Sequence, residues 1–144
     1  MRIYMDVCCY NRPFDDFSQD RVHLEAEAVL SIISRCEKHE WTLLASGIID
    51  YELSKLSDTD RYEQVQELYS AAKERVKLTE QAETRAANFL QNGLKPFDGL
   101  HLALAETAGA DIFLTTDDRF LKTAFKMNLS IKTANPVTWL MEVL

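Results

Sequence analysis

Two short apolar runs that each lead to an acid constrain this chain more than any other feature. Residues 3–5 (Ile-Tyr-Met) stop at Asp6, and residues 112–114 (Ile-Phe-Leu) lead through two threonines to Asp117 and Asp118. Runs of this kind are typical of buried strands. If both strands lie parallel in one sheet, their acids emerge at the same edge, where open α/β sheets place their ligands. The sequence therefore predicts an acidic site at the end of a parallel sheet.

The rest of the chain favours helices that alternate with strands. Turn formers predict a loop over residues 8–20. The spacing of apolar residues predicts helices within 18–39, from 46 or 47 to 56, and over 62–76, 79–90, 96–108, 120–126 and from 135 onward, with strands at 41–45 and near 131. This order predicts an α/β fold with a mostly parallel sheet that is covered on both faces, and an unbroken helical excursion between Glu52 and Ile112.

Size and composition limit the classes of protein that fit. The 144 residues, 47% of them hydrophobic, suit a single domain over residues 1–144. We expect no membrane segment, because no apolar run approaches roughly 18 residues. We also expect no signal peptide, because the N-terminus lacks a basic stretch followed by an apolar region of the required length. An odd number of cysteines predicts a reducing, cytoplasmic setting. The net charge of −7 argues against a broad basic face for nucleic acid, although bound divalent cations would make an acidic site attractive to phosphate.

Two further acids fall within predicted helices. Glu52 lies four residues after Ile48 and four before Leu56, inside an apolar stripe, where a carboxylate is costly unless it is paired or bound to metal. The structural alternative is a salt bridge to a buried arginine. Asp98 lies in the first turn of the helix that Pro96 opens, where the helix dipole favours any acid. Because Asp98 also heads an inward apolar stripe, the structural and the functional explanation weigh equally.

The late acidic pair offers two candidates for one place. Asp117 is the preferred strand-end acid and Asp118 the preferred helix cap, but the sequence leaves this assignment open. Thr115 adds a hydroxyl at the same edge. Several carboxylates without histidine or cysteine partners suit Mg²⁺ or Mn²⁺ better than zinc or copper. Metal ions held in this way activate water and neutralise the charge that develops on a phosphodiester.

The order of these motifs resembles the PIN domain of metal-dependent ribonucleases. The motifs are the strand that ends at Asp6, the helix that carries Glu52, the segment 98–105 (DGLHLALA) and the strand end 114–117 (LTTD). The resemblance covers essentially the whole chain. It implies a Rossmann-like three-layer α/β/α sandwich and hydrolysis of single-stranded RNA with Mg²⁺ or Mn²⁺.

Carried over residue by residue, the resemblance assigns the family's catalytic and metal-binding quartet to Asp6, Glu52, Asp98 and Asp117. Asn11, Thr115 and Asp118 are auxiliary candidates. His101, one turn after Asp98, is better explained as a satisfied helix histidine than as a site group. Many members of the family are toxins of toxin–antitoxin pairs and are commonly dimeric, so the resemblance also implies an antitoxin protein and a homodimer as partners.

We therefore expect Asp6, Asp98 and Asp117 to hold one cation, and Glu52 to help hold a second or to position water. Arg12, Arg119 and Lys122 are candidate phosphate contacts, although each alone is better explained as a solvated charge. One alternative is a catalytically silent PIN-like binding module. Another is a receiver-type phosphoacceptor domain, which ranks last because the adjacent acids come late in the chain. The RNA target, the cleavage rule and the oligomeric state do not follow from the sequence.

Overall fold

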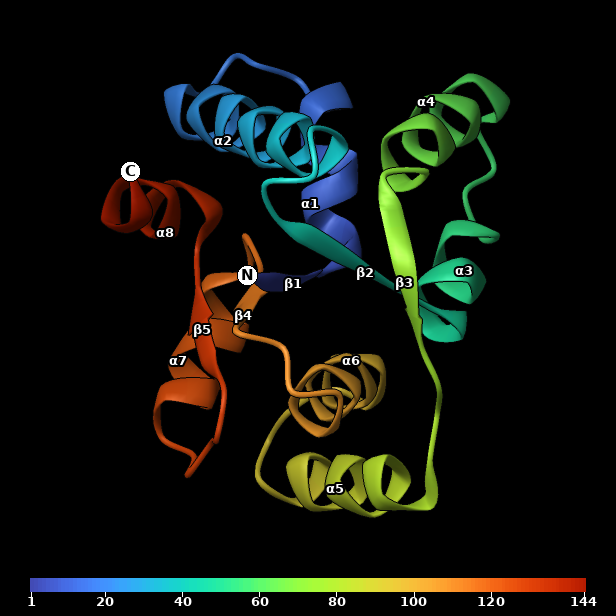
Figure 1. The fold of residues 1–144 in the computed structure, drawn as a ribbon, viewed down its shortest axis with the longest axis vertical. Helices are drawn as coiled ribbons and strands as arrows, with labels where there is room; N and C mark the ends of the chain where they lie inside the picture. Colours follow the sequence, from blue (N-terminus) through green and yellow to red (C-terminus); the bar gives the residue numbers. More distant parts are fainter.

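A five-stranded sheet lies at the centre of the computed structural model, which describes residues 1–144 (Figure 1). The strand order is β3-β2-β1-β4-β5, and all neighbouring strands are parallel. The strands are β1 (Arg2–Met5), β2 (Thr42–Ser46), β3 (Ala72–Val76), β4 (Ile112–Leu114) and β5 (Lys132–Ala134). Because β1 is central and pairs with β4 in the register Met5 to Leu114, the chain leaves both strands side by side at one edge.

Helices cover both faces of this sheet and complete the predicted three-layer α/β/α architecture. They are α1 (Val7–Asn11), the 3-10 turn η1 (Arg12–Phe14), α2 (Asp20–Glu37), α3 (Gly47–Leu53), α4 (Thr59–Tyr69), α5 (Glu80–Gln91), α6 (Pro96–Thr107), α7 (Asp118–Phe125) and α8 (Pro136–Val143). The α2 and α8 helices pack together on one side of the sheet, and α5 and α6 pack together on the other (Figure 1). None of these helices combines the length and the apolarity that a bilayer crossing requires.

The first apolar run forms the middle of the core. Ile3, Tyr4 and Met5 are fully buried, within a cluster of 34 buried hydrophobic residues. Phe113 of β4 stacks on Tyr4 with ring centroids 5.5 Å apart, and it stacks on Phe120 at 5.0 Å. Burial of such side chains contributes about 1.5–3 kcal/mol each, so the position of β1 is strongly determined.

Several predicted helix boundaries are confirmed by capping contacts. The side chains of Ser46, Thr79 and Asn135 each accept a hydrogen bond from a backbone N–H in the first turn of α3, α5 and α8. These bonds satisfy donors that a helix N-terminus otherwise leaves unpaired. Gly93 follows α5 with a φ of 106°, a left-handed conformation that suits glycine at a helix end.

The loop predicted for residues 8–20 is wrong in its first half, which forms α1 and η1. Asp6 starts α1, because its side chain accepts a hydrogen bond from the N–H of Val7. Pro13 lies in the first turn of η1, where its fixed φ is compatible with a helical turn. Helices this short have little intrinsic stability, so their formation depends on packing against α2 and α4.

The helix predicted for residues 62–76 is also wrong in its last part. The α4 helix ends at Tyr69, and β3 begins at Ala72. Side chains of β3 alternate between half-buried and exposed, as expected for an edge strand. Two charged residues of β3 form salt bridges, Glu74 with Arg2 and Arg75 with Asp50. The strand interrupts the helical excursion that the sequence predicts between Glu52 and Ile112.

Candidate active site

Asp6 occupies the predicted position at the carboxyl end of the central strand. Its Oδ1 accepts a hydrogen bond from Val7 N at 2.8 Å, and its Oδ2 accepts one from Thr115 Oγ1 at 3.0 Å. The Cys8 thiol lies 3.5 Å from the same Oδ2 and 3.3 Å from Thr115 Oγ1, a proximity that the sequence analysis did not consider. Burial raises the pKa of Asp6 to about 8, and the Cys8 thiol adds to the rise. The protein therefore holds this carboxyl where its charged form is costly.

Asp117 follows β4 and caps α7. Its Oδ1 accepts hydrogen bonds from Arg119 N at 2.9 Å and Phe120 N at 3.2 Å, while its own N–H donates to Thr115 Oγ1 at 3.1 Å. The fully buried Thr115 hydroxyl thus joins the two strand-end acids, as its place in the sequence suggested. Asp117 Oδ2 makes no hydrogen bond within the protein and is free to bind a ligand.

The preferred assignment of the helix cap to Asp118 is wrong, because Asp117 is the cap. Asp118 is exposed and forms a two-pronged salt bridge with Arg21 of α2, with bonds of 2.6 and 2.7 Å. This pair lowers the pKa of Asp118. Its carboxylate is therefore already neutralised by an arginine, whereas that of Asp117 is not.

Asp98 lies in the first turn of α6 and is a neighbour of the two strand-end acids. The pKa of Asp98 is raised to about 6. Desolvation is the largest cause of this rise, and the charges of Asp6 and Asp117 are the next largest. Its carboxylate makes no hydrogen bond or salt bridge. The sequence left a structural and a functional explanation of Asp98 equally open, and the structure shows no basic side chain paired with it.

These three carboxylates have the chemistry of a site for a hard cation. None of them forms a salt bridge, whereas the adjacent Asp118 does, and oxygen donors of this kind are the ligands of Mg²⁺ and Mn²⁺. No three histidine, cysteine, aspartate or glutamate side chains already converge as a formed metal site. The three carboxylates thus fit such a cation in charge and in atom type, but their side chains do not converge on a common point.

Glu52 is turned toward a histidine and not toward this trio of acids. Its carboxylate hydrogen-bonds Nε2 of the fully buried His101. The other ring nitrogen, Nδ1, lies 2.6 Å from the hydroxyl of Tyr4, which lies 2.8 Å from Ser46 Oγ. The expected alternative partner was an arginine, and the structure supplies a histidine in its place.

The chain of contacts from Ser46 through Tyr4 and His101 to Glu52 links β2, β1, α6 and α3. His101 is thus a satisfied helix histidine, as predicted, but it also lies near the acids, since it lowers the pKa of both Asp6 and Asp98. Only its position one turn after Asp98 signalled this in the sequence. The roles of Tyr4 and Ser46 had no local signal.

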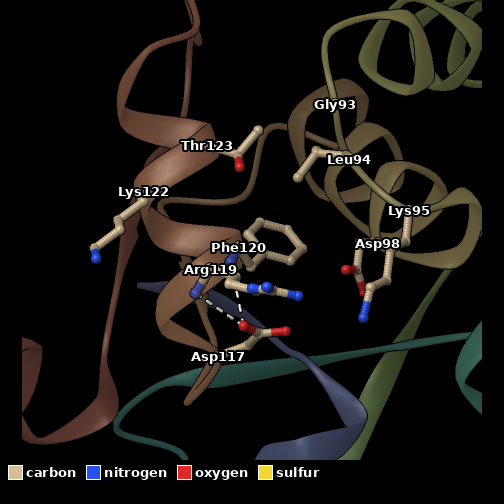
Figure 2. A pocket seen from close by; sticks show the side chains of 9 residues that line it. All are labelled: Gly93, Leu94, Lys95, Asp98, Asp117, Arg119, Phe120, Lys122 and Thr123. Carbon is tan, nitrogen blue, oxygen red and sulfur yellow. Dashed lines mark hydrogen bonds between the residues drawn. The ribbon is translucent and has the colours of Figure 1, made fainter.

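A cavity of about 360 Å³ opens beside the acids. Figure 2 shows Asp98 and Asp117 on its wall, with the side chain of Arg119 extending over Asp117 toward α6. Lys95 lines the cavity next to Asp98, whereas Lys122 points outward (Figure 2). Every other arginine of the chain pairs with a carboxylate, so Arg119 is the one whose charge remains available at the cavity.

Two candidates from the sequence are engaged elsewhere. Arg12 forms salt bridges with Asp15 and with the buried Glu25, so it stabilises the fold around α2. The Asn11 side chain donates to the Val7 carbonyl and accepts from Arg61, and it hydrogen-bonds none of the four predicted acids. Neither residue forms a hydrogen bond or salt bridge with an acid of the predicted site.

Fold and site together define an α/β protein with a parallel sheet and a group of acidic side chains at one edge of that sheet. The model of the PIN domain matches residues 11–126, and the chain belongs to the PIN domain family, whose members are generally nucleases. The matched range includes Glu52, Asp98 and Asp117, while Asp6 precedes it. The resemblance identified from the sequence motifs is thereby confirmed.

The fold is shared with a solved structure of low sequence identity. The chain is similar to one in the crystal structure of VapBC2 from Rickettsia felis bound to a DNA fragment from their promoter. The TM-score is 0.59 at 15% identity, and the likeness covers 94% of this chain and 98% of that chain. None of the curated proteins matches the chain in sequence. At this identity the likeness extends to the fold alone.

Proposed function

We propose that the chain, as one PIN domain over residues 1–144, is a Mg²⁺- or Mn²⁺-dependent endoribonuclease that cleaves single-stranded RNA in the cytoplasm. The observation that carries the proposal is the placement of Asp6, Asp98 and Asp117 near one another at one edge of the sheet, where none of them forms a salt bridge with a basic side chain. Such crowding raises carboxyl pKa values and is relieved when a divalent cation binds.

Each acid has a distinct part in this proposal. Asp6, Asp98 and Asp117 would hold the cation, and Thr115 keeps the first and last of them in register through its hydroxyl. Bound metal would supply an activated water and neutralise the charge that develops on the phosphate. Glu52, whose carboxylate His101 orients, would position the attacking water or help to hold a second ion. Arg119 would contact the phosphate next to the scissile one.

The test is cleavage of a single-stranded RNA with Mn²⁺ by the wild type and by Asp6→Asn, Asp98→Asn and Asp117→Asn. We expect each substitution to abolish cleavage, because each removes a charged oxygen ligand. Asp118→Asn is the matched control, since it changes the adjacent acid that Arg21 already pairs. Undiminished cleavage by the three site variants, or equal loss in the control, would contradict the proposal.

A catalytically silent PIN-like binding module is the second candidate. The observation in its favour is that no three potential ligands already converge on a metal site. Calorimetric titration with Mn²⁺ separates the two functions. A nuclease should bind Mn²⁺ in the wild type and lose this binding in Asp98→Asn, whereas a silent module should give no heat that depends on the carboxylates.

The likeness to VapBC2, whose crystal structure has it bound to a DNA fragment from its promoter, supports a proposal about partners. We propose that this chain is likewise the toxin of a toxin–antitoxin pair, that it forms a homodimer, and that a small DNA-binding protein encoded beside it is its antitoxin. Co-expression of the two proteins tests this. The neighbouring protein should co-purify with the chain and suppress its ribonuclease activity, and a neighbour that does neither is not an antitoxin.

A further inference from the structure

Two exposed aromatic rings meet beside the predicted acids. Tyr51 of α3 and Phe97 of α6 have ring centroids 5.6 Å apart, with their planes tilted by 31°. These two residues are 47% and 41% exposed. Tyr51 immediately precedes Glu52 in the sequence, and Phe97 immediately precedes Asp98. The pair therefore bridges the two helices that carry the two predicted helix acids.

The surroundings of this aromatic pair are charged. The Lys55 ammonium lies 4.6 Å from the centroid of the Tyr51 ring and forms no salt bridge. Lys95 caps α6 two residues before Phe97, lines the cavity and also lacks a carboxylate partner. The core of a protein–protein interface is typically a continuous apolar patch depleted of charged residues. Two rings flanked by unpaired lysines fit instead a ligand that is both aromatic and anionic.

We propose that Tyr51 and Phe97 form a stacking platform for an unpaired base of single-stranded RNA, with Lys55 at the phosphate of the stacked nucleotide. The inference rests on the proposed function, which makes RNA the substrate, and it adds how the substrate is held. Unstacked bases stack on exposed aromatic side chains, and every base has a π face that can do so. Such a platform therefore favours single strands without distinguishing their sequences. Bases in a duplex already stack on their neighbours and do not reach it.

The test compares binding with and without bases. Fluorescence anisotropy in EDTA, which withholds the metal needed for cleavage, measures the affinity for a single-stranded RNA, an abasic strand of equal length and a duplex. We expect the wild-type rings to favour the single strand over the abasic strand by about ten- to a hundredfold, as one or two stacked bases provide. The double substitution Tyr51→Leu with Phe97→Leu should remove this preference, because leucine keeps the apolar volume and lacks the ring face.

Controls separate the platform from a general loss of structure. Tyr62→Leu removes a partly exposed ring on α4 and should leave the preference unchanged. Thermal unfolding should show the double variant as folded as the wild type. Lys55→Met should reduce the salt dependence of binding, with the slope of log K against log salt falling by about 0.7 for one lost phosphate contact.

The outcomes separate the platform from the proposed catalysis. The platform is refuted if the double variant binds the single strand as tightly as the wild type does. It is also refuted if the wild type binds the single strand no more tightly than the abasic strand, or binds neither strand. These conclusions hold whatever the cleavage assay shows. If the base preference depends on the two rings but no cleavage occurs, the platform stands and the nuclease proposal fails. If the double variant converts a dimer to a monomer and base-dependent binding is absent, the rings are a protein interface and the platform is again refuted.

Discussion

Replacement of Asp6 by asparagine should stabilise the metal-free protein at neutral and alkaline pH while it abolishes the proposed activity. Asparagine keeps the shape of the side chain, its oxygen can still accept from Val7 N, and its amide can donate to Thr115 Oγ1, whose hydroxyl is free to rotate. What the substitution removes is a carboxyl that burial makes costly to ionise. The site would thus be held at a cost to stability that metal binding offsets.

The magnitude follows from the pKa of this group. The pKa of Asp6 rises from 3.8 to about 8 on folding, so between these values the folded protein binds the proton that the unfolded chain has lost. The contribution of Asp6 to the free energy of unfolding therefore falls as pH rises through this window, by about 1.4 kcal/mol per pH unit, or about 4 kcal/mol between pH 5 and pH 8. Above about pH 6 the Cys8 thiol contributes in the opposite direction, because hydrogen bonds lower its pKa from 9.0 to about 6 in the folded protein. Asp98 adds a fall in the same direction up to its pKa of about 6, and this fall should be smaller in Asp6→Asn, because the charge of Asp6 contributes to the raised pKa of Asp98.

Urea denaturation in EDTA at pH 5, 6.5 and 8 measures this difference. We expect Asp6→Asn to be close to the wild type at pH 5 and more stable by about 3–4 kcal/mol at pH 8. Added Mn²⁺ should raise the stability of the wild type at pH 8 and leave that of the variant nearly unchanged, because only the wild type retains the charged ligand. A difference between the two proteins that does not vary with pH would refute the argument that burial of the Asp6 charge is the cause.

Three further predictions concern individual contacts. Asp118→Asn should retain wild-type cleavage and lose only the contact with Arg21, which a cleavage assay beside Asp117→Asn checks. Tyr4→Phe should lower the free energy of unfolding by about 1–3 kcal/mol, because it leaves buried hydrogen-bonding atoms of Ser46 and His101 without their partner; urea denaturation measures this, and an unchanged midpoint would mean that the chain adds no stability. Gly93→Ala should lower the free energy of unfolding by about 1–2 kcal/mol, because the backbone φ of 106° is unfavourable for alanine. A steric clash is not the cause, since an added Cβ would lie 3.7 Å from the nearest atom. A larger loss in the same urea assay would indicate a packing defect instead.

The parts of the fold that the sequence predicts correctly are those with strong local signals. The strand that ends at Asp6 is uniformly apolar, and the helix boundary at Thr79 carries its own capping side chain. The β3 strand lacks such a signal, because residues 72–76 (AKERV) place alanine and valine four apart, a spacing that also fits a helix. Pairing with β2 decides the outcome, and this pairing is not local.

The same distinction holds within the candidate site. Asp6 is recognisable because it directly follows a buried strand. Asp117 is recognisable because it follows a buried strand after two threonines. The division of labour between Asp117 and Asp118 was not predictable, because it depends on Arg21, which lies 97 residues away in the sequence. Likewise, the partner of Glu52 comes from another helix. Short-range patterns locate the acids, and long-range contacts determine which of them remain free.

The central place of β1 has a consequence for the order of events during synthesis. The β1 strand is synthesised before β4, with which it pairs, and the hydrogen bond from Thr115 to Asp6 joins residues 109 positions apart. A nascent chain that lacks β4 cannot assemble the acidic edge, however much of its helical structure has formed. The complete acidic edge therefore exists only after Thr115 and Asp117, which follow β4, have been synthesised and folded onto β1.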